Sequence, residues 1–403
     1  MNTFYETSSG KIINQDNLDA LREIEDNSID SCISDFPYNI QFMNKDWDSI
    51  GEQKDFYLWC FIRANQLYRI LKSGAYSAIF GSVKTNHRMK CAFEDAGFII
   101  VEEIDWLYLS GMPHNQDIGK MYERLGDFEN AKIYNDWKTA GLKPAHETIT
   151  IFQKPLCRTY TDNITLNGCG AMNIGACRVP ISKEDIEMLN NKASKNPTTN
   201  YSDKCDKVYG SYKLDIAMPA NPEGRFPPNI VLSDNFTEVL DYQTGITKSS
   251  GGSGEASTKN RARHIYGAYN QETNESYKND SLGGYGDVGG GSRLFPIFKY
   301  CPKVSPSERL LSNGDRNPHT TLKPKDLIKW LIKLITPKNG TTIDITAGSC
   351  THAVCCEELN REENYNLKYI DIEICNDEQN PYCDVGKQRV EDVINTQCRK
   401  RLF

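Results

Sequence analysis

Four consecutive residues near the start of the chain, Asp35-Phe36-Pro37-Tyr38, could together hold a flat ring that carries an amino group. They follow an apolar, strand-like run at residues 29–33. Asp35 could accept one N–H of the amine, the carbonyl of Phe36 could accept the other, and Tyr38 could stack on the ring. Because a residue before proline is held extended, Pro37 fixes where that carbonyl points. Enzymes that act on a DNA base extrude it, read its edge and stack on it. The segment fits that chemistry, and the alternative is a strand that ends in an ordinary proline turn.

A second group of polar residues lies near the C-terminus, where His319, Thr321 and Lys323 precede Pro324. Proline is tolerated in the first turn of a helix, and the apolar residues of 325–335 recur at helical spacing. The pattern predicts a helix that begins directly after these polar side chains.

The order of elements after this helix is typical of a site for a nucleotide-like ligand. A strand leads into a turn of small residues, then into a helix and a second strand that ends in an acid. In such a fold the ligand lies at the carboxyl edge of a parallel sheet, where the acid can reach ribose hydroxyls. The segments are a strand at 341–344, a turn at 345–350, a helix at 351–359 and a strand at 367–373.

With these motifs in this order, the chain resembles the permuted (beta-type) amino-group DNA methyltransferases of the phage and prophage branch. In that family a D-P-P-Y element comes first, a variable target-recognition region follows, and an H-x-T-x-K-P helix leads into a D-P-F-x-G-S-G cofactor loop. The same order is met here in Asp35 to Tyr38, His319 to Pro324 and Asp344 to Cys350. Shorter segments that also look like this branch are 80–82, 95–98, Trp106, 142–147, 224–227 and 292–295.

The resemblance implies a doubly wound, mostly parallel α/β sheet of the Rossmann-like S-adenosylmethionine (SAM) methyltransferase type, with an irregular target-recognition region inserted. It implies that residues 1–156 form the catalytic half, 157–305 the target-recognition region and 306–403 the cofactor half. The implied activity is site-specific methylation of double-stranded DNA, from SAM to the exocyclic amine of a flipped base. By family resemblance adenine N6 comes ahead of cytosine N4, and a restriction-modification role is expected.

The resemblance also assigns roles to individual residues. Asp35, Phe36, Pro37 and Tyr38 form the expected catalytic set. In the expected cofactor set, Asp344 faces the amino end of the methionine moiety of SAM, Glu373 faces the ribose and the backbone around Gly348 holds the tail. The other members of that set are Thr346, Ser349, His319, Thr321 and Lys323.

The chain departs from the family pattern at several positions. Phe36 replaces the first proline, Thr346 an aromatic residue that flanks the cofactor, Cys350 the last glycine of the loop and Asp371 a glycine of the next strand. The Cβ of Cys350 could block a positive φ or a close approach to the ligand. The alternatives left open are a non-catalytic DNA-binding homologue and a relative that uses another SAM-derived cofactor or modified base. Protein glutamine methylation fits less well, because there the cofactor loop precedes the catalytic element.

The charge pattern bears on DNA binding. A formal net charge of -7 and a pI of about 5.6 argue against a protein that coats nucleic acid without specificity. Local basic clusters could still contact phosphates, and the alternative is a solvated charged face. The candidates are Lys259, Arg261 and Arg263 in the middle of the chain, and Lys84 and Arg88 after the strand at 76–80.

Other sequence features set the remaining expectations. No apolar run approaches the roughly 20 residues of a membrane span, and no secretory signal is visible. The 14 cysteines are scattered without zinc spacing, so no metal is expected. We expect a cytoplasmic protein in a bacterial or phage-infected cell, with the oligomeric state open and a homodimer as one option.

The first part of the chain alternates strand and helix patterns, as in a parallel α/β sheet. The predicted strands are 11–13, 31–34, 76–80 and 98–106, and the predicted helices are 18–24 (capped by Asp16), 56–71 and 86–96.

Overall fold

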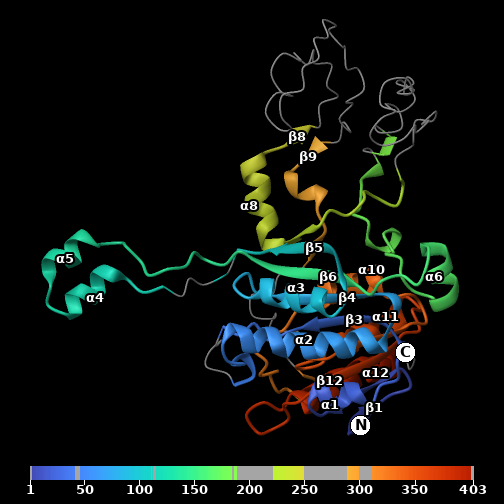
Figure 1. The fold of residues 1–403 in the computed structure, drawn as a ribbon. Helices are drawn as coiled ribbons and strands as arrows, with labels where there is room; N and C mark the ends of the chain where they lie inside the picture. The colour runs from blue at the N-terminus through green and yellow to red at the C-terminus, as the bar shows by residue number, and fades with distance from the viewer. Residues whose placement is uncertain are drawn as a thin grey trace, which may run out of the picture. The chain divides into compact units, whose positions relative to one another are not determined.

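The computed structural model describes residues 2–40, 46–109, 111, 115–183, 186–187, 221–248, 288–298 and 311–400 (Figure 1). The chain divides into two compact units. The first unit comprises residues 1–177, 228–237 and 295–403, and the second comprises residues 178–227 and 238–294.

Within the described residues, the first unit is built on one ten-stranded sheet. Most neighbouring strands run parallel, whereas β1 and β6 run antiparallel to the strands beside them. In spatial order the strands are β1 (Thr3–Glu6), β2 (Gly10–Asn14), β12 (Lys368–Glu373), β11 (Thr341–Asp344), β3 (Ile29–Asp35), β4 (Leu71–Gly81), β6 (His146–Gln153), β5 (Ile99–Leu107), β7 (Ile230–Ser233) and β10 (Ile297–Phe298).

Helices cover both faces of this sheet (Figure 1). One face packs against α1 (Asn17–Arg22), α2 (Gln53–Ile70) and α3 (Asn86–Asp95), and the other against α10 (Lys325–Ile335), α11 (Thr351–Glu362) and α12 (Tyr382–Lys400). The predicted fold class, a doubly wound and mostly parallel α/β sheet, is confirmed.

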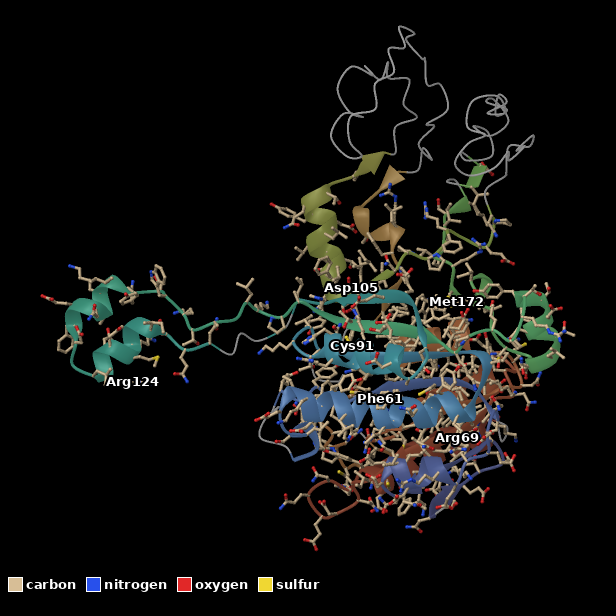
Figure 2. The ribbon with its side chains drawn as sticks, viewed as in Figure 1. Phe61, Arg69, Cys91, Asp105, Arg124 and Met172 are labelled. Carbon is tan, nitrogen blue, oxygen red and sulfur yellow. The ribbon has the colours of Figure 1, made fainter. Side chains whose placement is uncertain are left out.

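The amphipathic pattern of α2 explains how a surface helix is held on the sheet. Its buried side chains recur every three or four residues, which places them on one stripe. Phe61 and Arg69, which Figure 2 labels on this helix, are only half-buried. The helix begins with a capping box between Glu52 and Asp55, which satisfies backbone N–H groups of the first turn. The stripe consists of Phe56, Cys60, Arg63, Ala64, Leu67 and Ile70.

The central strands bring three acids to one edge of the sheet. β3, β11 and β12 are adjacent and parallel, with Ser31 opposite Thr342 and Asp344 opposite Asp371. Asp35, Asp344 and Glu373 are the last residues of these strands. Because parallel strands end at the same edge, the catalytic and cofactor motifs converge although some three hundred residues separate them in the chain.

Most elements predicted within residues 1–156 and 306–403 are confirmed, and Asp16 caps α1 through the backbone N–H of Leu18. β4 begins at Leu71, earlier than the polar residues before Tyr76 suggest. The reason is an irregularity in the ladder, since Ile29 pairs with Leu71 and Ser31 already pairs with Tyr76. The sequence did not predict β1, β6, β7, β10 or α12.

Four further helices were also not predicted: α4 (Ile118–Arg124), α5 (Phe128–Ile133), α6 (Tyr160–Asn167) and α8 (Asp234–Thr244). The 3-10 turns are η2 (Asp46–Asp48), η3 (Gly175–Cys177) and η4 (Gly291–Leu294). β7 and β10 fall inside the predicted recognition region, 157–305, yet they extend the main sheet. The role of that region and its boundaries stay a prediction.

The described part of the second unit is held by a few local contacts. β8 (Thr247–Lys248) and β9 (Val288–Gly289) pair antiparallel. Asp241 accepts hydrogen bonds from the backbone N–H and the hydroxyl of Ser292, both at 2.8 Å. No helix among the described residues of the chain is long and apolar enough to cross a membrane.

Candidate active site

Backbone N–H groups of the loop after β3 converge on one buried carboxylate. Asp48 accepts backbone N–H bonds from Tyr38, Asn39 and Ile40 at 2.6, 2.8 and 3.1 Å. Asn39 lies in the left-handed region with φ 51°, a conformation that asparagine tolerates better than most residues. The backbone at Tyr38 is therefore held by a residue ten positions further along, for which the sequence carries no motif.

Phe36 stands where the family has proline, and its side chain is part of the core. The ring packs edge-on against Trp59 with centroids 5.2 Å apart and lies 5.9 Å from Phe93. It is 2% exposed. The substitution therefore anchors the end of β3 by packing, while the backbone carbonyl that the catalytic prediction needs is unchanged.

A cluster of charges surrounds Asp35. The ammonium of Lys323 lies 2.8 Å from Oδ2 of Asp35 and 3.1 Å from Oε2 of Glu147. The Tyr38 hydroxyl donates to Glu147 at 3.1 Å and accepts from Lys323 at 3.2 Å. Oδ1 of Asp35 is buried and has no hydrogen-bond partner among the described residues. Burial raises the pKa of Asp35, Lys323 lowers it and Glu147 raises it, with a net upward shift.

Two residues join the catalytic and cofactor motifs. Asp344 accepts a hydrogen bond from the Ser34 hydroxyl at 2.6 Å and from the backbone N–H of Thr346 at 3.0 Å. The Thr346 hydroxyl donates to the backbone carbonyl of Asp35 at 2.9 Å. Burial, followed by the charge of Asp371, raises the pKa of Asp344 to about 7. The threonine that replaces the family's aromatic residue thus ties the two motifs together.

The cofactor loop needs glycine at position 348. Gly348 has φ 52°, and a Cβ there would lie 2.6 Å from Nε2 of His319. Its N–H donates to the Glu373 carboxylate at 2.7 Å. Burial raises the pKa of Glu373 to about 7. The next residue, Ser349, is held through its hydroxyl by Asn317 at 2.9 Å and through its carbonyl by Arg389 of α12.

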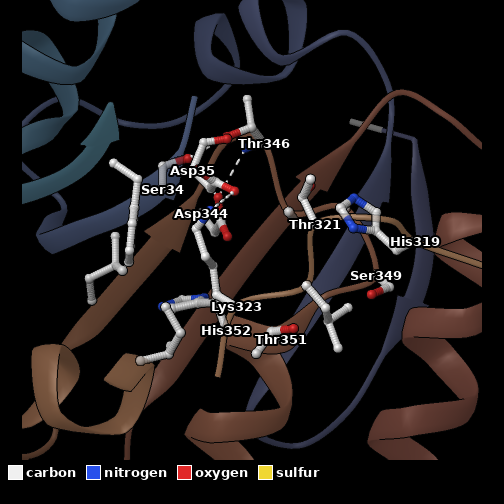
Figure 3. A pocket seen from close by; sticks show the side chains of 16 residues that line it. Ser34, Asp35, His319, Thr321, Lys323, Asp344, Thr346, Ser349, Thr351 and His352 are labelled. Atoms are coloured by element: carbon white, nitrogen blue, oxygen red, sulfur yellow. Dashed lines mark hydrogen bonds and ion pairs between the residues drawn. The ribbon is translucent and has the colours of Figure 1, made fainter. Parts of the chain in front are cut away.

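These motifs line one pocket, shown in Figure 3. Its free volume is about 40 Å³, below the roughly 300–1,000 Å³ of typical ligand sites. Glu373 and Tyr38 are not among the residues that line the pocket, but each contacts one of them. Glu373 accepts the N–H of Gly348, and the Tyr38 hydroxyl accepts from Lys323. The predicted site residues in the lining are Asp35, His319, Thr321, Lys323, Asp344, Thr346, Gly348 and Ser349.

Cys350 corrects one expectation from the sequence. It adopts φ 57°, so its Cβ does not prevent the left-handed conformation. The side chain is fully buried and faces α12, where a Cβ on Gly386 would lie 2.5 Å from the Cys350 sulfur. A glycine inside a helix weakens that helix. Here the absence of a side chain at Gly386 leaves the space that the Cys350 thiol occupies.

We predict that Cys350→Gly leaves the affinity for SAM within about threefold of wild type, because the lost side chain points away from the pocket. Gly386→Ala should destabilise the protein by roughly 1–3 kcal/mol through overpacking, and adding Cys350→Gly should restore most of that loss. Calorimetric SAM titration and thermal melts of the three variants check this. A gain in affinity above tenfold for Cys350→Gly would show instead that the thiol obstructs the loop.

Asp371, the other departure from the family pattern, forms a buried pair that the sequence did not predict. Its carboxylate lies 2.6 Å from Nδ1 of His352 and accepts the backbone N–H of Ala353 at 3.1 Å. His352 lines the pocket, and its Nε2 lies 3.0 Å from the Thr342 hydroxyl. Burial lowers the pKa of His352, but Cys356 and Asp371 raise it to a net value well above the usual range. The pair fixes the start of α11 on β12.

The expected DNA contacts fall into two groups. Lys84 and Arg88 are exposed at the start of α3, and between them Thr85 donates to the backbone carbonyl of Tyr38 at 2.8 Å. These cations therefore border the catalytic loop. Lys259, Arg261 and Arg263 lie outside the described residues.

Comparisons with known proteins support the motif pattern. The chain is 27% identical over 200 residues to the type II methyltransferase M.HindIII of Haemophilus influenzae, a match that covers 40% of the chain and 64% of that relative. It is 24% identical over 241 residues to M.HpaI of Haemophilus parainfluenzae, covering 57% of the chain and 62% of that relative. The matches thus span somewhat less than two thirds of either relative.

Among solved structures, the chain is similar to the PvuII DNA methyltransferase, which is described as cytosine-N4-specific, with a TM-score of 0.46 and 15% identity over 99% of the chain and 94% of that protein. The family described as N6/N4 DNA methylase matches residues 29–383, which include every motif of the pocket. The chain belongs to the N6/N4 DNA methylase family.

Proposed function

We propose that this chain transfers a methyl group from SAM to the exocyclic amine of a base flipped out of double-stranded DNA, with adenine N6 first and cytosine N4 second. The observation that carries the proposal is the junction between the two motifs. The Thr346 hydroxyl bonds the backbone carbonyl of Asp35, so the cofactor loop and the catalytic strand meet within hydrogen-bonding distance.

The residues present fit the cofactor. SAM is the methyl donor of this family, as predicted from the sequence. Gly348 leaves room that a Cβ would fill, and Asp344 and Glu373 end adjacent strands at the same edge. We assign Asp344 to the amino group of the methionine moiety and Glu373 to the ribose. The chemistry that SAM supplies when bound is an electrophilic methyl group.

In the proposed mechanism the side chains align the amine and attack is direct. Oδ1 of Asp35, buried and unpaired among the described residues, accepts one N–H of the target amine. The backbone carbonyl of Phe36 accepts the other, and the Tyr38 ring stacks on the base. Alignment of this kind can supply much of the rate enhancement of a transfer reaction. Once the amine is methylated it must lose a proton, and Asp35 is the base in contact with it.

The proposed partner is double-stranded DNA in the cytoplasm of a bacterial or phage-infected cell. Lys84 and Arg88 border the catalytic loop, and we assign them to phosphate contacts. Sequence recognition is assigned to residues 157–305, with Lys259, Arg261 and Arg263 as further phosphate contacts. Contacts of this type make binding weaker as salt rises.

Incubation of the protein with tritiated SAM and unmethylated genomic DNA tests the proposal. Label in acid-insoluble DNA supports it, and retention of all label in the small-molecule fraction at saturating enzyme contradicts it. Preincubation with unlabelled SAM serves as the control for carry-over of counts on bound protein.

The pKa of Asp344 predicts how cofactor binding depends on pH. Its pKa lies at about 7, so the carboxylate that would face the cationic amino group forms only as the pH rises through that value. Ionisation of Asp344 should therefore raise the affinity for SAM about eightfold between about pH 6 and about pH 7.5. Asp344→Asn should bind weakly and keep only the pH dependence that Glu373 contributes, since the pKa of Glu373 also lies at about 7. Calorimetry at several pH values measures it. A wild-type affinity that is constant or falls over this range would show that Asp344 has another role.

The proposed stacking of Tyr38 gives a second prediction in solution. Base–aromatic stacking is worth roughly 1–3 kcal/mol, so Tyr38→Ala should reduce the flipped population by about 5- to 150-fold. Tyr38→Phe keeps the ring and loses only the hydroxyl bonds to Glu147 and Lys323, so it should stay within a few-fold of wild type. A fluorescent 2-aminopurine at the mapped target position reports extrusion. Equal fluorescence with wild type and Tyr38→Ala would rule out stacking by this ring.

A further inference from the structure

Glu147 is a charged residue of the pocket region to which the motifs assign no role. It belongs to β6, two strands away from β3, and its carboxylate reaches the catalytic loop. Lys323 lies between Glu147 and Asp35, at 3.1 and 2.8 Å. The lysine side chain is 9% exposed, so solvent does little to screen either contact.

Glu147 changes the charge balance around Asp35. The ammonium of Lys323 alone would cancel the negative charge of Asp35, the group that is proposed to hold the target amine. During methyl transfer a positive charge moves onto that amine, and a neutral Asp35–Lys323 pair would offer it little stabilisation. With Glu147 included, two carboxyl groups face one ammonium, so the charge of Lys323 is shared between them and no longer balances Asp35 alone.

We propose that Glu147 is a positioning residue that acts as the counter-ion of Lys323, so that Lys323 orients Asp35 without cancelling the charge that Asp35 presents to the target amine. This rests on the proposed function. The Tyr38 hydroxyl, which bonds both Glu147 and Lys323, links the counter-ion to the ring that would stack on the base.

The proposal predicts opposite effects of the two partners on the same group. The titratable groups that face Asp35 in the described part of the chain are Lys323, Glu147 and Tyr38. Lys323 lowers the pKa of Asp35 and Glu147 raises it. Loss of Glu147 should therefore let Asp35 ionise at lower pH, and loss of Lys323 should delay its ionisation to higher pH.

The experiment compares Glu147→Gln, Lys323→Met and the double variant with wild type. Glu103→Gln is the matched control, because it also breaks a Lys–Glu pair: Glu103 lies on β5, the strand beside β6, and its partner Lys90 lies on α3. The first readout is the pH dependence of the single-turnover methylation rate. The second readout is the ¹³C NMR titration of the Asp35 carboxyl, and this measurement does not depend on activity. Its signal is assigned by its loss in Asp35→Asn.

We expect the midpoint of the rise of the methylation rate with pH, and the midpoint of the carboxyl titration, to move by about one pH unit or more. Both should move to lower pH in Glu147→Gln and to higher pH in Lys323→Met. In the double variant the two shifts should largely cancel, and Glu103→Gln should match wild type. Shifts in the same direction, or none, would overturn the proposal. If wild type transfers no methyl group, the proposed function fails, and the carboxyl titration alone still decides the role of Glu147.

Discussion

Asp35→Ala is expected to abolish methyl transfer and to leave the protein folded. The carboxylate has Oδ1 buried without a partner among the described residues, so its removal takes away only the contacts with Lys323 and Tyr38. Lys323 keeps Glu147 as a partner. Loss of a group that orients and stabilises the reacting centre typically costs at least about a hundredfold in rate. Single-turnover methylation and a thermal melt measure the two effects separately.

Asp30→Ala is the matched control for this prediction. Asp30 lies on the same strand and is buried, but it pairs with Lys72 at 2.6 Å and accepts the backbone N–H of Thr341 at 2.8 Å. Its loss should lower the melting temperature and leave the transfer rate per folded molecule unchanged. If Asp35→Ala retained single-turnover activity near wild type, Asp35 could not be the group that holds the amine.

The second large effect is expected for Gly348→Ala, which should weaken SAM binding more than about tenfold. Two costs add at this position. An L-residue at φ 52° carries roughly 1–2 kcal/mol of backbone strain, and the new Cβ would lie 2.6 Å from Nε2 of His319. The His319 ring or the loop must then move, and the N–H that holds Glu373 moves with it. Each 1.4 kcal/mol lost is a factor of ten in affinity.

Gly314→Ala separates the strain from the clash. Gly314 also has a positive φ, 89°, but a Cβ there would meet nothing within 4 Å. It should cost some stability and leave SAM binding unchanged. Calorimetric titration of both variants checks the pair, and wild-type affinity in Gly348→Ala would show that the loop does not hold the cofactor.

The sequence alone predicts the part of the site that follows from strand ends. Asp35, Asp344 and Glu373 each end an apolar strand, and adjacent parallel strands bring such residues to one edge. Their convergence in the structure needed no information beyond the order of the elements. The helix that follows Pro324 was predicted for a different reason, because its apolar residues recur clearly at helical spacing.

Other parts of the site carry little local signal, and although Glu147 ends one of the short segments that resemble the family, the sequence assigns it no role. Glu147, Arg389 and Asp48 are single charged residues on ordinary elements, and only the tertiary structure brings them to the motifs. The accommodation of Cys350 by Gly386 likewise joins the start of α11 to α12, residues that are 36 positions apart in the sequence. β10 has two residues, too few for a period to be recognised.

Mass spectrometry of nucleosides from DNA treated with the protein and SAM tests the central claim most directly. We predict a gain of one methyl group on the exocyclic amine of adenine or, second, cytosine, and its absence in DNA treated with Asp35→Ala. N6-methyladenine would show that the target base is adenine, and N4-methylcytosine would show that it is cytosine. DNA without either modified base, after treatment with folded protein that binds SAM, would contradict the account.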